Sequence, residues 1–154
     1  MQALYQLDLT QEKKPADTPS AEQLSQTLDT EHDSDATRNF ASQLALSAWA
    51  VHADADKIVA ELAPDWPTHR QPPVDRAILR LAYYEISSGH APVSVAINEA
   101  VELAKVYCTE QAPAFINGVL DKLAKRVDGQ PTTPLPAPPT ENQADAWLDD
   151  AVNG

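Results

Sequence analysis

Apolar side chains recur at steps of three and four residues through most of this chain, which is the spacing of one helical face. No segment shows the strict alternation that is typical of a strand, so the pattern predicts an all-α fold. The clearest helix follows two prolines, and Gly89 is its predicted end, because glycine readily adopts the conformation that closes a helix. Its apolar stripe consists of Val74, Ile78, Leu81, Ala82 and Ile86.

Two more amphipathic helices are predicted before residue 127. One follows Pro92, and the other opens near Pro113, because proline suits the first turn of a helix. Residues 74–127 are therefore expected to form packed amphipathic helices. The two stripes are Ile97, Ala100, Val101, Ala104 and Cys108, and then Phe115, Ile116, Val119, Leu120 and Leu123.

The first 34 residues carry a weaker pattern. Residues 1–10 predict a short helix that can bury Leu4 and Leu7. Met1 stands directly against this helix without a capping residue, so we expect that the beginning of the helix is missing. Residues 11–34 are polar and predict a loop with at most one weak helix near 20–29.

A longer helical pattern begins near residue 35, where Asp33, Ser34 or Asp35 can cap it. The segment 52–56 is expected to interrupt this helix, and Asp54 to cap a second one that Pro64 and Pro67 end. The predicted buried positions are Phe40, Leu44, Ala48 and Val51 in the first helix, and Ile58, Val59 and Leu62 in the second.

Length and composition fit one soluble helical domain over residues 1–127. The chain has 154 residues and 43% hydrophobic content, with no run near the roughly 18–20 apolar residues that a membrane helix needs. The N-terminus does not resemble a secretory signal. The single cysteine excludes an internal disulfide framework and a multi-cysteine metal site. We expect a cytoplasmic protein.

The net charge of −12 argues against simple electrostatic adhesion to nucleic acid, because Lys and Arg supply most phosphate affinity. Residues 128–154 hold five acids, no Lys or Arg, and the stretch PTTPLPAPP. This composition predicts a disordered acidic tail. Residues 1–127 are acidic too, so binding to RNA would need a local patch or a partner.

No catalytic constellation can be assembled from the sequence. The four histidines are scattered, and the chain lacks a glycine-rich phosphate loop. Cys108 lies on an apolar stripe and is expected to be a small packed residue. Glu102 and Lys105 are spaced as a surface ion pair. We therefore predict a protein that is not an enzyme and that needs neither a metal nor a cofactor.

Four residues depart from simple amphipathic patterning. Glu85 lies near an apolar stripe, where a carboxylate needs a partner such as a hydroxyl or an arginine. Asn117 and Gly118 stand within a helical pattern that both residue types weaken. Gly118 can permit close helix approach, and Asn117 can bond a neighbour or face a ligand. Phe115 can pack in the core or stack an unpaired RNA base.

These features coincide with a family resemblance. The segments QALYQLDLT, VDRAILRLAYYEI and PVSVAINEAVELAKVYCTEQAPAFINGVLDKLAK resemble, in order, the signature segments of the NusB family. The resemblance covers residues 1–127, although residues 35–66 match only in helical pattern. It implies a fold of two packed three-helix bundles.

The resemblance also implies a function in binding. NusB proteins pair with NusE, a small-subunit ribosomal protein, on the boxA sequence of nascent RNA. The complex helps RNA polymerase to read through terminators, especially in ribosomal RNA operons. Carried over by position, Tyr5, Phe115 and Asn117 are the expected RNA-binding residues. The expected interface with NusE consists of Asp75, Arg76, Leu79 and Tyr83.

Two departures from the family pattern lead to alternatives. The arginine-rich segment that precedes the first family helix is absent before Met1, and Gln111 and Ala114 are neutral where relatives often carry charge. The chain alone is therefore expected to bind RNA poorly. One alternative is a protein-interaction module that has lost RNA binding and acts as a homodimer or through its tail. A second, disfavoured because no cofactor-binding segment follows, is a relative of the helical domain of RNA methyltransferases.

Overall fold

The computed structural model describes residues 1–11, 19–27 and 34–129, and this part of the chain is helical without strands. The all-α prediction is therefore confirmed. Of the predicted tail at 128–154, residues 130–154 lie outside the described residues, so the tail stays a prediction. The elements are α1 (Gln2–Gln11), α2 (Ala21–Thr27), α3 (Asp35–Ala50), α4 (His52–Leu62), the 3₁₀-helix η1 (Thr68–Arg70), α5 (Pro73–Ser88), α6 (Val93–Tyr107) and α7 (Ala112–Val127).

Local sequence signals account for several helix ends. The Ser34 hydroxyl accepts a hydrogen bond from the Thr37 amide at 3.2 Å and thereby caps α3. Pro73 opens α5, and Pro113 stands in the first turn of α7. Gly89 ends α5 in the left-handed conformation, with φ of 68°. The weak helix expected near 20–29 is present as α2.

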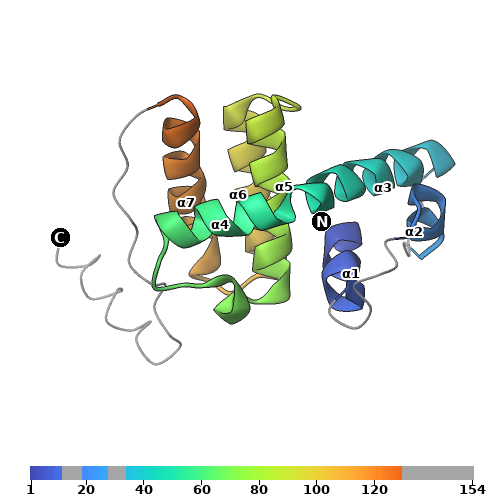
Figure 1. Ribbon diagram of the computed structural model, residues 1–154, viewed down its shortest axis with the longest axis horizontal. Coiled ribbons are helices and arrows are strands. Elements are labelled where there is room, and N and C mark those ends of the chain that lie inside the picture. Colours follow the sequence, from blue (N-terminus) through green and yellow to red (C-terminus); the bar gives the residue numbers. More distant parts are fainter. Residues whose placement is uncertain (12–18, 28–33, 130–154) are drawn as a thin grey trace.

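The helices form two packed bundles that share α5 (Figure 1). The first bundle is α1, α2 and α3, which enclose Leu4, Leu7 and Leu24. In the second bundle α4 crosses α5 and α7, while α6 packs against both of these helices. Each bundle has its own hydrophobic core, and consecutive residues of α5 contribute to both. Ala77 packs in the core of the first bundle, and Ile78 packs in the core of the second. This shared helix fixes the bundles relative to each other.

The predicted buried face of α3 is only partly correct. Ala48 is fully buried, but the Phe40 side chain is 58% exposed. The buried positions of α3 are instead small, namely Ser42, Ala45 and Ala48. Small side chains let neighbouring helices approach closely, whereas Phe40 lies outside that contact. The size of the side chains therefore determines which face of α3 is buried, and the spacing of apolar residues alone did not predict it.

The junction between α3 and α4 also differs from its prediction. The interruption falls at Val51, before the expected segment, and α4 begins at His52. Asp54 therefore lies in the first turn and is not the cap. Within the described ranges, none of the helices is long and apolar enough to cross a membrane.

Candidate RNA and partner surfaces

Phe115 lies on the first turns of α7 and is half-buried against the second core. Its ring forms an edge-to-face pair with the Trp66 ring, with centroids 4.6 Å apart and an interplanar angle of 87°. This edge-to-face arrangement is favourable, because the positive edge of one ring meets the negative face of the other. Trp66 is 8% exposed and thus anchors Phe115 from the connection between α4 and α5. The sequence analysis did not single out Trp66.

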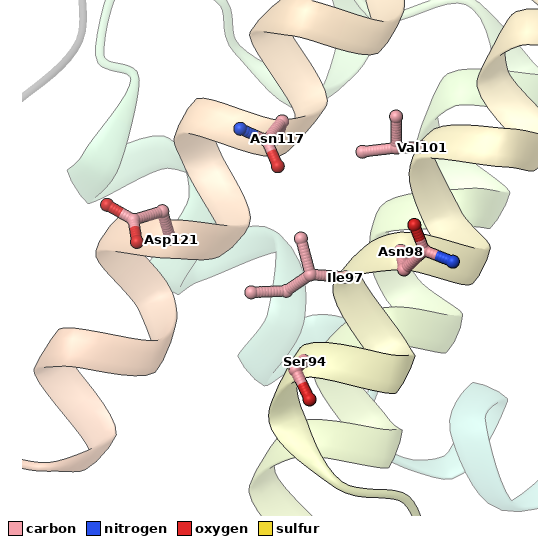
Figure 2. A pocket seen from close by; sticks show the side chains of 6 residues that line it. All are labelled: Ser94, Ile97, Asn98, Val101, Asn117 and Asp121. Carbon is pink, nitrogen blue, oxygen red and sulfur yellow. The ribbon is translucent and has the colours of Figure 1, made fainter.

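Asn117 points away from the surface that carries Phe115. Two residues along a helix correspond to a rotation of about 200°, so side chains at these positions point in nearly opposite directions. Asn117 is exposed and lines a shallow groove of about 360 Å³ between α6 and α7 (Figure 2). Ser94, Asn98 and Asp121 also line this groove with polar groups, and Ile97 and Val101 line it with apolar ones.

Tyr5, the third expected RNA-binding residue, belongs to the other bundle. It lies on α1 and packs, half-buried, against the first core. The structure thus distributes Tyr5, Phe115 and Asn117 over three different surroundings. The three residues therefore do not lie together in one site. Their assignment to RNA binding remains a prediction.

The four residues expected at a partner interface lie mostly inside the isolated chain. Asp75, Arg76 and Leu79 are 5%, 7% and 1% exposed, and Tyr83 is half-buried against the second core. Leu79 fills the core, and Arg76 pairs with a buried carboxylate. Among the four, Tyr83 offers the most accessible surface. A role in binding NusE remains a prediction for the whole set.

Asp75 has a partner within the chain, the Cys108 thiol that follows α6. Burial raises the pKa of Asp75, and the hydrogen bond from Cys108 partly offsets this rise. Burial and the neighbouring Asp75 raise the pKa of the Cys108 thiol to about 12. The thiol therefore stays protonated at neutral pH, which is unsuitable for a nucleophile. It serves as a half-buried packing residue beside the Asp75 carboxyl.

A buried network of four charged side chains joins α1, α4 and α5. Asp8 accepts from Arg76 Nε at 2.8 Å and from Arg80 Nη1 at 2.8 Å. Arg80 also holds both oxygens of Asp56, at 2.9 and 2.7 Å. Arg76 and Arg80 stand four residues apart on α5, which places them on one face. The sequence analysis missed this network, although Asp8 beside two buried leucines of α1 was a signal for it.

Glu85 is 7% exposed, and no hydroxyl or arginine of the described ranges donates to its carboxylate. The expected partner is therefore absent from that part of the chain. Burial raises the pKa of Glu85, as does the negative charge of Glu99, while His90 and the N-terminal amine lower it. The ionised form is thus disfavoured in the folded protein.

We expect Glu85→Gln to raise the thermal midpoint at pH 7, because an isosteric amide removes the unfavourable buried charge. The pKa of Glu85 in the folded protein lies above its ordinary value of 4.5. The stability of the wild-type protein therefore rises as the pH falls from this raised pKa toward 4.5. The advantage of the variant should therefore shrink on acidification and vanish below pH 4.5. Melting curves of both proteins across this pH range test the prediction. An advantage that does not change with pH would contradict it.

Taken together, the described helices define an all-α protein of two packed bundles that share α5. Among residues 1–11, 19–27 and 34–129, no three His, Cys, Asp or Glu residues gather as a metal site.

Comparison with known proteins identifies the family. Residues 1–125 match the NusB family, and this chain belongs to it. The transcription antitermination protein NusB of Herpetosiphon aurantiacus is 36% identical over 134 residues, covering 84% of this chain and 88% of the relative. The protein of the same name from Symbiobacterium thermophilum is 38% identical over 136 residues, covering 84% and 86%. The solved structure of T. maritima NusB superposes with a TM-score of 0.66 at 30% identity, covering 80% of this chain and 84% of that one.

Proposed function

We propose that this protein is a transcription antitermination factor that binds boxA RNA together with NusE and acts with RNA polymerase, notably in ribosomal RNA operons. The observation that carries the proposal is the NusB family match over residues 1–125. Relatives that cover most of the chain are named transcription antitermination proteins. The proposed activity is binding, without a catalytic step.

The accessible aromatic surface at α7 supports the RNA part of the proposal. Phe115 packs against Trp66 in an edge-to-face pair and is only half-buried, so part of its surface stays available. An aromatic surface can stack an unpaired base, which is the common mode of single-strand recognition. The net charge of −12 opposes tight binding by the protein alone. A partner that adds positive charge would offset this repulsion.

A titration with labelled single-stranded boxA RNA tests the proposal, with the protein alone and with NusE added. We expect weak binding by the protein alone and specific binding by the pair. A scrambled RNA of equal length and composition is the control, and it should bind less tightly to the pair. Equal binding of boxA and scrambled RNA in both arms would overturn the proposal.

A second candidate function is a protein-interaction module without RNA binding. The acidity of the chain favours it. Retention of NusE binding without any specific binding of RNA, in the same titration, would select this alternative. A homodimer would show as a doubled mass in sedimentation without NusE.

A further inference from the structure

Arg70 is a surface cation at the end of η1, on the connection between α4 and α5. Its side chain makes no ion pair with any residue of the described ranges. Several other surface cations are compensated: Lys105 pairs with Glu102, and Lys125 pairs with Asp121. Arg70 is thus an uncompensated positive charge on a strongly acidic chain.

The connection that carries Arg70 is held in place on both sides. The Gln71 side-chain amide donates to the Trp66 carbonyl at 3.1 Å, and both residues are buried. The Arg76 guanidinium donates to the Thr68 carbonyl, also at 3.1 Å, and so ties η1 to α5. These bonds fix the backbone on which Arg70 stands, while its side chain stays in solvent.

The same connection touches the aromatic surface of α7. Trp66 lies four residues before Arg70 and packs edge-to-face against Phe115. In Figure 1 the green connection passes below the ends of α5 and α7, where both helices begin. A rigid connection thus presents a free cation at the end of the molecule that also presents the Phe115 ring.

We propose that Arg70 binds a backbone phosphate of the single-stranded RNA whose base stacks on Phe115. A guanidinium suits this role, because its planar array of donors matches two phosphate oxygens. Phosphate contacts fix the position of a strand, while contacts to bases read its sequence. The inference rests on the proposed function and assigns part of the phosphate contact to the α4–α5 connection.

The test compares Arg70→Gln with Arg38→Gln, each in the presence of NusE. Both variants lose one arginine charge, but Arg38 lies on α3 in the first bundle and pairs with Asp35. Binding is measured by fluorescence anisotropy of labelled boxA RNA over a series of salt concentrations. We expect Arg70→Gln to weaken binding roughly tenfold, which corresponds to about 1.4 kcal/mol of binding free energy, because one charge-assisted contact to a phosphate is lost. The slope of log affinity against log salt should fall by about 0.7, the value for one single-strand phosphate contact.

Each outcome decides the inference. A loss confined to Arg70→Gln, with unchanged thermal midpoint and unchanged NusE affinity, supports it. Equal losses in both variants would show a general charge effect and overturn it. A loss of NusE affinity that matches the loss of RNA affinity would place Arg70 at the protein interface and overturn it too. If the wild-type pair shows no specific RNA binding, the proposed function itself fails and the inference fails with it.

Discussion

Replacing Arg80 with methionine is expected to lower the free energy of unfolding by about 3–5 kcal/mol, the usual cost of breaking a buried ion pair. The Arg80 side chain is only 6% exposed and bridges Asp8 of α1 to Asp56 of α4. Its guanidinium also lies 5.2 Å from the centroid of the Trp49 ring. Methionine retains much of the stem but leaves both carboxylates without this partner.

The electrostatic surroundings of Arg80 explain why the expected loss of unfolding free energy is large. Burial acts to lower the pKa of Arg80, yet hydrogen bonds to Asp56 and Asp8 raise it above its ordinary value. The charged form is therefore stabilised by these partners despite its desolvation. Removing it leaves Asp8, whose side chain is 6% exposed, in a poorly solvated place with less compensation.

A matched control is Arg126→Met. Arg126 pairs with Glu61 at 2.6 Å, but their side chains are 37% and 46% exposed. Exposed pairs contribute about 0–1 kcal/mol, so this variant should lose little stability. Urea denaturation of both variants measures the difference. Equal small losses would show that the buried network does not stabilise the junction of the two bundles.

Replacing Leu120 with alanine is expected to cost about 2–5 kcal/mol, through lost burial and the cavity left behind. Leu120 is 1% exposed in the second core, where α7 packs against α4, α5 and α6. Because four helices meet around this core, their backbones cannot readily collapse onto the space. Partial collapse would place the cost at the lower end of the range.

Val127→Ala on the same helix is the control for Leu120→Ala. Val127 is 52% exposed at the end of α7, so its loss should change stability by no more than about 0.5 kcal/mol. Both variants can be compared by the midpoint of urea unfolding, provided that the slope of the unfolding free energy against urea concentration is unchanged. A small loss for Leu120→Ala would mean that the second core repacks without a cavity.

Sequence reasoning succeeded where the controlling interactions are local. Pro73, Pro113 and Gly89 act through their own backbone preferences, so the ends of α5 and the start of α7 were predictable. The surface pair of Glu102 and Lys105 was predictable for the same reason, because its partners stand three residues apart. The resemblance of the signature segments to NusB proteins is confirmed by the family match.

The candidate site was less predictable, because its geometry depends on contacts between distant segments. Phe115 owes its orientation to Trp66, which precedes it by 49 residues in the printed sequence. Asp8 meets Arg76 across a separation of 68 residues. Arg76 therefore lies inside the chain, although its place on α5 suggested an accessible interface. No pattern within one helix specifies such pairings.

The sequence by itself determined the helical class, most helix ends, the family and the acidity of the chain, which opposes the proposed RNA binding by the protein alone. The tertiary structure alone decided which face of α3 is buried and which charged side chains are buried or remain free. Burial of the α3 face depends on close approach of small side chains, and burial of Arg76 and Arg80 depends on carboxylates from α1 and α4. Arg70 has no such partner among the described residues, and its charge is therefore available to a ligand.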